Sequence, residues 1–292
     1  MITRRKIRNP LKIAVASGKG GTGKTTVAVN LFHFFSRTFG FKTQLVDCDV
    51  EEPNDLLFFP ESNLEDKETA TQLIPQIDNN RCTFCRNCVS FCEFNAIVVI
   101  PPVNFSEVNS SLCHSCGACS VACEFEAISE IPETIGTIRD YRIGPNEILS
   151  EGRLKIGSAM QTLLISKVKQ KVREDMEVVI LDAPPGTSCP VVETISEADY
   201  VILVTEPTPF GLYDLRLTVD LLREIRKPFG AIINKSGIGN HKVHKFLSDQ
   251  KIELLSEIPY NRDYASKYAS GELLSSHGME IELKYKAIRE NV

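Results

Sequence analysis

Eight of the ten cysteines in this chain lie in two runs that share one spacing. Each run reads C-x2-C-x2-C-x3-C, and the runs comprise Cys82, Cys85, Cys88 and Cys92, then Cys113, Cys116, Cys119 and Cys123. Cysteine thiolates at short, repeated spacings bind iron–sulfur clusters or zinc ions. The two runs therefore predict metal chemistry rather than a framework of disulfides.

The cysteine runs belong to a longer internal repeat. Residues 82–97 align with residues 113–128 at a constant offset of 31, with eight of 16 positions identical. The spacing resembles that of bacterial two-cluster ferredoxins, in which the fourth cysteine of each run binds the other cluster. The resemblance implies two [4Fe–4S] clusters, one held by Cys82, Cys85, Cys88 and Cys123, the other by Cys113, Cys116, Cys119 and Cys92. A pair of zinc sites is the alternative.

The repeat departs from the ferredoxin pattern at one position in each half. Glu93 and Glu124 follow the fourth cysteines, where such ferredoxins usually have proline. Losing proline removes a restraint on φ, and a carboxylate beside a cluster disfavours the addition of an electron. We therefore expect lower reduction potentials than a proline-containing version would have. His114, inside the second run, either tunes its cluster by hydrogen bonding or is a solvated loop residue.

A glycine-rich segment near the N-terminus predicts a phosphate site. Residues 18–26 read GKGGTGKTT and satisfy the pattern G-x4-G-K-[ST]. Glycines let backbone N–H groups close around phosphate oxygens, and a following helix directs its positive end at them. Lys24 should reach the β- and γ-phosphates, and Thr25 should bind Mg²⁺. The predicted binding residues are Gly18, Gly20, Gly21, Thr22, Gly23, Lys24, Thr25 and Thr26.

A second lysine, Lys19, makes the loop KGGTGKT. This pattern resembles the deviant phosphate loop of the MinD/ParA superfamily, which includes the nitrogenase iron protein and the Mrp-type cluster carriers. In that superfamily the early lysine reaches the partner subunit's phosphates, where a cation can neutralise charge that develops during phosphoryl transfer. The resemblance implies an ATPase that forms a homodimer on binding ATP, with Lys19 and Lys24 in catalytic roles.

The same resemblance extends to acids that follow two predicted strands. Asp49, in the segment VDCDVEEPN, matches the aspartate that activates water, and Asp47 matches a neighbouring Mg²⁺-site acid. Asp182, in VVILDAPPGTS, matches the acid that holds Mg²⁺ through water, and Gly186 lies in a segment that resembles the second switch. Two solvated acids in a turn are the alternative for Asp47 and Asp49.

The base site has weaker signals. Asn234 and Lys235 resemble the start of the guanine-reading motif N-K-x-D, but the sequence continues as NKSG. The acid that would read guanine is missing, which favours ATP. In the superfamily the matching asparagine contacts adenine, whereas a loop or capping role is the alternative for Asn234. Pro259 and Tyr260 lie where the superfamily wraps backbone around the base.

The pattern of apolar runs predicts the elements that position these residues. Strands are expected at Lys12–Ser17, Lys42–Asp47, Val178–Asp182, Tyr200–Thr205, Phe229–Asn234 and Ile252–Ile258, and helices at Lys24–Arg37 and Tyr213–Arg226. Strands alternating with helices predict an α/β fold: a P-loop NTPase with a mainly parallel sheet covered by helices on both faces. Residues 76–132 are expected to form an inserted α+β ferredoxin-like domain, with 1–75 and 133–292 forming the ATPase domain.

Net charge and hydropathy argue against some classes of partner, namely nucleic acids and membranes. The net charge is −5, which argues against nonspecific nucleic-acid binding. No apolar run approaches the roughly 18 residues of a membrane span. The basic cluster Arg4–Arg8 reads as a solvated tail, with contact to an anionic surface as the alternative, and segment 279–292 lacks a clean apolar face. We expect a cytoplasmic protein without an export signal or a stable membrane anchor, with Cys48 and Cys189 buried as small hydrophobes.

Three functions are compatible with these motifs. The first is electron transfer to or from an unidentified redox partner, gated by ATP. The second is assembly or delivery of iron–sulfur clusters to a partner protein, and the third is MinD/ParA-type positioning with a redox-sensing insert. The first is favoured because eight ligands suggest permanent holding of clusters, and the chain has no cysteine after Cys189. Mrp-type carriers use a C-terminal C-x-x-C pair instead.

Overall fold

The computed structural model describes residues 10–273, which divide into two compact units. The first unit contains the described residues of ranges 1–67, 138–153 and 165–292, and the second contains 68–137 and 154–164. Two separate stretches of chain therefore build the second unit, which extends beyond the predicted insert 76–132. The Arg4–Arg8 cluster and segment 279–292 lie outside the described residues.

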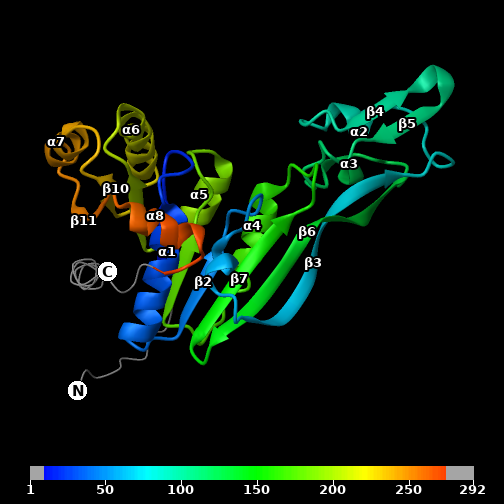
Figure 1. Cartoon of the computed structure of the whole chain (residues 1–292). Helices are drawn as coiled ribbons and strands as arrows, with labels where there is room; N and C mark the ends of the chain where they lie inside the picture. The colour runs from blue at the N-terminus through cyan, green and yellow to red at the C-terminus, as the bar shows by residue number, and fades with distance from the viewer. Residues whose placement is uncertain (1–9, 274–292) are drawn as a thin grey trace. The chain divides into compact units, whose positions relative to one another are not determined.

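The described strands include a nine-stranded sheet in the order β11-β10-β9-β1-β8-β2-β7-β6-β3 (Figure 1). All pairs from β11 to β7 are parallel, as predicted for this fold class. Six strands of the first unit lie within two residues of the predicted ranges: β1 (Leu11–Ala16), β2 (Thr43–Asp47), β8 (Val178–Asp182), β9 (Tyr200–Thr205), β10 (Phe229–Ser236) and β11 (Leu254–Pro259). Strand β7 (Glu147–Leu154) was not predicted.

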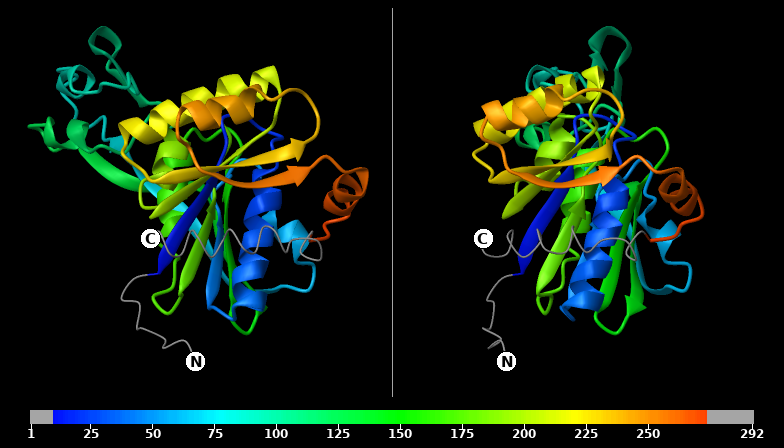
Figure 2. Two further views of the ribbon diagram at one scale, coloured as in Figure 1. Left: turned by 90° about the vertical axis from the view of Figure 1, so that its left-hand side faces the viewer. Right: turned by 60° about the vertical axis from the view of Figure 1, so that its left-hand side comes forward.

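Helices cover both faces of this sheet in the first unit. Helix α1 packs against β1, β2 and β8, and Figure 2 shows α6 and α7 on the opposite side of the sheet from α1. This division follows from right-handed crossovers, because the chain moves one way across the sheet through α1 and the other way through the later helices. The helices are α1 (Lys24–His33), α4 (Gln161–Lys169), α5 (Cys189–Ile195), α6 (Pro209–Glu224), α7 (Lys242–Asp249) and α8 (Arg262–Ala269).

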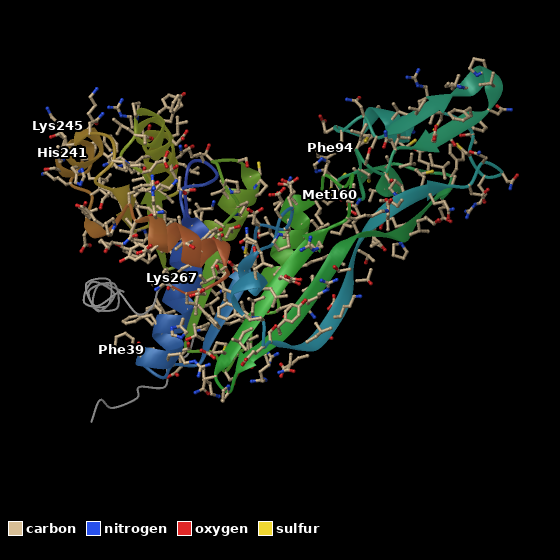
Figure 3. The ribbon with its side chains drawn as sticks, in the orientation of Figure 1. Phe39, Phe94, Met160, His241, Lys245 and Lys267 are labelled. Atoms are coloured by element: carbon tan, nitrogen blue, oxygen red, sulfur yellow. The ribbon has the colours of Figure 1, made fainter. Side chains whose placement is uncertain are left out.

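Two predicted helices differ from the observed ones at their ends. The helix predicted at Lys24–Arg37 becomes α1 followed by a π-helical turn, Phe34–Thr38. Phe34, Phe35 and Phe39 pack against one another here, and Phe39 is labelled in Figure 3. Helix α6 begins at Pro209, four residues before the predicted start, because Thr208 caps it by accepting a hydrogen bond from Gly211.

The core of the first unit explains the continuous apolar runs. Ile13, Leu45, Ile180 and Ile202, on the central strands, are fully buried. A parallel strand with helices on both faces has no solvent side, so its sequence does not alternate between apolar and polar residues. None of the helices in the described part of the chain is both long and apolar enough to cross a membrane.

The second unit has a small core and little regular structure. Strands β4 (Ile97–Ile100) and β5 (Phe105–Val108) form an antiparallel pair, and the one-turn helices α2 (Asn87–Ser90) and α3 (Ala118–Val121) contact each other. Cys88, Cys119, Ile97 and Val99 form the buried cluster. Strands β3 (Asn63–Ile77) and β6 (Ile128–Gly144) each contribute residues to both units. Helices α2 and α3 occupy equivalent positions in the sequence repeat.

Candidate functional site

The phosphate loop connects β1 to α1 at the carboxyl edge of the sheet. At Gly18 a Cβ atom would lie 2.5 Å from the backbone oxygen of Asp214 on α6. Gly23 has φ +96°, and a Cβ there would lie 2.2 Å from the side-chain nitrogen of Asn234. Open space surrounds Gly20 and Gly21, where no atom would come within 4 Å of a Cβ. The loop backbone is thus held at both ends and accessible in the middle, as phosphate binding requires.

The end of β10 braces this loop from one side. The Asn234 side-chain amide donates to the Thr22 carbonyl oxygen at 2.7 Å, and Lys235 Nζ donates to the Gly21 carbonyl oxygen at 2.9 Å. Asn234 therefore lies against the phosphate loop. Pro259 ends the neighbouring strand β11, and its neighbour Tyr260 is exposed.

Gly186 lies on the opposite side of the phosphate loop. Its N–H donates to the Ser17 carbonyl oxygen at 3.0 Å, and its φ is +103°. Only glycine adopts this conformation without strain, and no atom lies within 4 Å of the position its Cβ would take. The space beside Gly186 is therefore open, while its N–H ties this segment to the end of β1.

Strands β2 and β8 bring Asp47 and Asp182 together, because these two residues are direct register partners. Asp47 is almost fully buried and accepts backbone N–H groups from Asp49, Asn54 and Asp55, at 3.0, 2.9 and 3.1 Å. Its oxygens are thus engaged in shaping the loop that carries Asp49. This arrangement gives Asp47 an organising role in addition to the metal-site role implied by resemblance.

Asp182 has the geometry of a metal-site acid. Its Oδ2 accepts a hydrogen bond from the Thr25 hydroxyl at 2.7 Å, whereas its Oδ1 is buried and no group donates to it. Burial raises the pKa of Asp182 to about 6, although Lys24 opposes the shift. Burial likewise raises the pKa of the half-buried Asp49, again opposed by Lys24. A buried acceptor beside Thr25 and Lys24 fits the requirements of a hydrated Mg²⁺ ion.

Asp55 adds a third buried carboxylate that the sequence prediction missed. It begins a short 3-10 helix, Asp55–Phe58, is fully buried, and no group donates to either of its oxygens. Burial raises its pKa well above the ordinary range, and the charges of Asp47 and Asp182 add to the shift. Three neighbouring buried acids favour the binding of a proton or of a nearby cation, which would reduce the repulsion between their charges.

Lys19 and Glu206 form an ion pair within the chain. Glu206 follows β9 and is buried, and its other oxygen accepts from Lys235 Nζ at 3.2 Å. Although burial favours the neutral acid, the hydrogen bonds from Lys19 and Lys235 lower the pKa of Glu206. The lysine predicted to act across a dimer is therefore held by its own subunit in this structure.

The second unit contains two cavities, each lined by four cysteines. One is lined by Cys82, Cys85, Cys88 and Cys123, and the other by Cys92, Cys113, Cys116 and Cys119. These groupings coincide with the two ligand sets implied by the ferredoxin resemblance. Among the side chains of residues 10–273, no three His, Cys, Asp or Glu residues converge on a point where one metal ion could sit.

The two cavities share a backbone arrangement. The N–H groups of Ala96 and Ala127 donate to the Cys92 and Cys123 sulfurs, both at 3.3 Å. Positive φ angles recur at equivalent positions of the repeat, for the pairs Phe84 and Ser115, Arg86 and Gly117, and Asn95 and Glu126. Donors to sulfur stabilise thiolate ligands of a cluster, so the local structure fits such a group.

Exposure differs among the cysteines. Cys85 and Cys116 are the exposed members of their cavities, while Cys88, Cys113 and Cys119 are buried. Cys48 is buried, as predicted. Cys189 is exposed, contrary to prediction, because it begins α5 just beyond the edge of the sheet.

His114 stacks on Phe94, with ring centroids 3.8 Å apart, and both line the second cavity. The stacked ring therefore borders the site that the resemblance assigns to the second cluster.

Comparison with known proteins identifies the family. Residues 13–274 match the model of the CobQ/CobB/MinD/ParA nucleotide-binding domain. The chain belongs to the CobQ/CobB/MinD/ParA family. It is 30% identical over 282 residues to an uncharacterized protein of Methanocaldococcus jannaschii, covering 96% of this chain and 94% of that protein. ATPases of the MinD/ParA family hydrolyse ATP.

More distant members of the family extend the comparison. The iron-sulfur cluster carrier protein of Aquifex aeolicus is 23% identical, over 95% of this chain and 65% of that protein. The MinD protein of Pyrococcus horikoshii complexed with Mg-ADP has a TM-score of 0.59 at 17% identity, covering 97% of each chain. The cell division ATPase MinD of Pyrococcus furiosus has a TM-score of 0.58 at 15% identity, covering 95% of this chain and 99% of that one. The structural matches show a shared MinD/ParA fold.

Sequence analysis missed two residues of this MinD/ParA site, Asp55 and Glu206. Asp55 lies six residues beyond Asp49, in a loop where an acid reads as solvated. Glu206 directly follows β9 at the carboxyl edge of the parallel sheet, where ligand-binding residues concentrate. Its position after β9 could have identified Glu206 as a site residue from sequence. Nothing in the sequence separates Asp55 from a solvated loop acid.

Proposed function

We propose that this chain is a dimer-forming ATPase that holds two [4Fe–4S] clusters in its second unit and couples nucleotide state to electron transfer. The observation that carries the proposal is the grouping of eight cysteines into two cavities, each combining three residues of one run with the fourth of the other. If each run supplied all four ligands of one metal site, each cavity would instead be lined by the four cysteines of a single run. The partner is an unidentified electron-transfer protein.

The nucleotide site supplies the ATPase part of the proposal. Lys24 would bind the β- and γ-phosphates. Thr25 and Asp182, whose side chains hydrogen-bond to each other at 2.7 Å, would hold a Mg²⁺ ion, Asp182 through water. Asp49 would orient the attacking water and accept its proton, and burial, which raises the pKa of Asp49, strengthens it as a base. Lys19 leaves Glu206 and stabilises charge on the partner subunit's phosphates.

The second unit supplies the redox part. Bound [4Fe–4S] clusters would accept and release single electrons. The cysteines of each cavity provide four thiolates, and the N–H groups of Ala96 and Ala127 stabilise charge on two of the sulfurs. Residues 76–132 form the cluster-binding part, attached to the ATPase part through β3 and β6. Among the described residues the cysteines do not converge on a single point, which favours clusters over zinc, because zinc needs four ligands converging on one ion.

Iron analysis tests the metal content. Anaerobically reconstituted protein should contain about eight iron atoms per chain, as two four-iron clusters require. Cys85→Ser and Cys116→Ser should each lose roughly half of the iron, whereas the matched control Cys189→Ser should lose none. Zinc in place of iron, or equal losses in all three variants, would contradict the cluster assignment.

Coupling is tested on the same anaerobic sample. ATPase rate and cluster reduction potentials should be measured without nucleotide, with ADP and with ATP. Reduction potentials that are the same in all three nucleotide states would refute the coupling. They would still be compatible with an ATPase that holds clusters. A carrier function is the second candidate, favoured by the similarity to proteins named iron-sulfur cluster carriers. Rapid transfer of iron to an apo-ferredoxin would favour that candidate.

A further inference from the structure

The cysteine cavities are copies of one site, so differences between them are informative. At the repeat offset of 31, Phe94 of one cavity corresponds to Phe125 of the other, and Ala96 corresponds to Ala127. The first cavity is the one lined by Cys82, and the second is the one lined by Cys113. Glu93 and Glu124 also correspond, so these carboxylates act on both cavities alike.

Charge breaks this equivalence at two positions. Arg86 lines the first cavity, and its counterpart in the second cavity is Gly117. Val99 lines the first cavity and is buried, and its counterpart in the second is Glu130. Of the residues lining the first cavity, Arg86 alone carries a permanent charge. Glu130 is the corresponding acid of the second cavity, where His114 is the other ionisable neighbour.

The backbone shows that Arg86 occupies a position suited to glycine. Its φ is +68°, close to the +71° of Gly117. A side chain other than glycine, asparagine or aspartate in this left-handed region is strained. The first half of the repeat therefore tolerates strain to place a guanidinium group beside its cavity.

Glu130 is placed beside the second cavity by two observations. Its Oε1 lies 3.6 Å from the position that a Cβ of Gly117 would take, within the loop that carries Cys116. Glu130 also lines the second cavity together with Cys113 and Cys116. Glycine at position 117 thus leaves room for the carboxylate to approach the loop.

We propose that Arg86 and Glu130 give the two cavities unequal reduction potentials, so that the first electron resides in the cavity lined by Arg86. The proposal rests on the proposed function and adds a direction to it. Reduction adds one electron, and hence one negative charge, without forming a bond or moving a proton. Arg86 attracts that charge and Glu130 repels it. Electrons entering at the second cavity therefore move toward the first.

Potentiometric titration of the reconstituted full chain, with dithionite as the one-electron reductant and detection by EPR, tests this. Wild type should show two potentials. Glu130→Val, which copies Val99, should raise the lower potential and leave the higher one in place. Arg86→Gly, which copies Gly117 and relieves backbone strain, should lower only the higher one. The double variant should bring the two potentials together.

Matched controls separate local from general charge effects. Glu107→Gln removes an exposed acid of the same unit that lines neither cavity, and should move neither potential. Both Arg86 and Glu130 are exposed, so the separation should also shrink as ionic strength rises. Thermal unfolding would show whether Glu130→Val alters folding. If it does, Glu130→Gln removes the same charge with a polar side chain of similar size.

Two results would overturn the inference in distinguishable ways. Full iron content with potentials that Glu130→Val and Arg86→Gly leave unchanged, or shift in the opposite direction, would overturn this inference alone. A chain that binds no iron after anaerobic reconstitution would overturn the proposed function and this inference with it.

Discussion

Lys19 of the phosphate loop and Glu206 at the end of β9 are bound to each other within one subunit. The MinD/ParA resemblance gives Lys19 a role on the phosphates of the partner subunit. In the proposed dimer, Lys19 would therefore exchange Glu206 for phosphate. Glu206 also binds Lys235, which donates to the phosphate loop at Gly21, so the pair would connect dimer formation to the shape of the loop.

Glu206→Gln should favour the dimer. Removing the charge weakens the hold on Lys19, so dimerisation should occur at about tenfold lower ATP concentration, a difference of about 1.4 kcal/mol. Light scattering against ATP concentration measures this. Glu224→Gln, at the exposed end of the same unit's helix α6, is the control. An unchanged or higher ATP requirement in Glu206→Gln would refute the exchange.

Glu206 should also make stability depend on pH. Its pKa is lowered in the folded state, so the unfolded state binds more protons between the folded pKa and the ordinary value of about 4.3. The stabilisation is complete above that ordinary value and is lost as pH falls through the folded pKa. Wild type should exceed Glu206→Gln in unfolding free energy by about 1.5 to 3 kcal/mol at pH 7. Urea titrations should show this gap closing below about pH 4.3.

Asp55→Asn should have opposite effects with and without metal. Without Mg²⁺ it removes one of three neighbouring buried charges, which should stabilise the protein by roughly 1 kcal/mol and raise Tm by about 2 to 4 °C. Adding Mg²⁺ and ADP should raise the Tm of Asp55→Asn by less than it raises the Tm of wild type, because the variant has lost an acid near the ion. Glu52→Gln, an exposed acid in the same loop, is the control. A lower metal-free Tm in Asp55→Asn would contradict the predicted charge repulsion.

Gly23→Ala should be damaging while Gly20→Ala is tolerated. A Cβ at Gly23 would clash with Asn234 and would require a left-handed residue, which should cost about 1 to 3 kcal/mol. Gly20 has open space around it and no positive φ, so its replacement should leave the unfolding free energy within about 0.5 kcal/mol. Chemical denaturation of both variants measures the difference. Equal losses would show that the brace formed by Asn234 is unimportant.

Much of the ATPase sheet could be predicted because its strands are buried on both faces. Such strands are continuous apolar runs, so Val178–Asp182 and Tyr200–Thr205 were located to the residue. Strands β3 and β6 were not predicted. Most of the first half of β3 is exposed and charged, which hides the strand from any search for apolar runs.

The candidate site divides in a similar way. Lys24, Asp182 and the cysteines belong to spacings that local sequence reveals. Asp55 and Glu206 act through contacts with residues more than 100 positions away, at Asp182 and Lys19 respectively, and only the folded sheet brings those residues together. Cys189 was placed wrongly because a cysteine next to apolar residues reads as buried, whereas here it is the first residue of a helix.

Because Cys85 and Cys116 are exposed, one cysteine of each cavity is accessible to a reagent in solution. In chain stripped of metal, an alkylating reagent would reach these two cysteines, together with Cys189, before the buried Cys88, Cys113 and Cys119. A loaded cavity would protect its exposed cysteine, while Cys189 would label in every state. The ratio of labelling at Cys85 and Cys116 to that at Cys189 would therefore report the occupancy of each cavity separately, in a cell extract as readily as in purified protein.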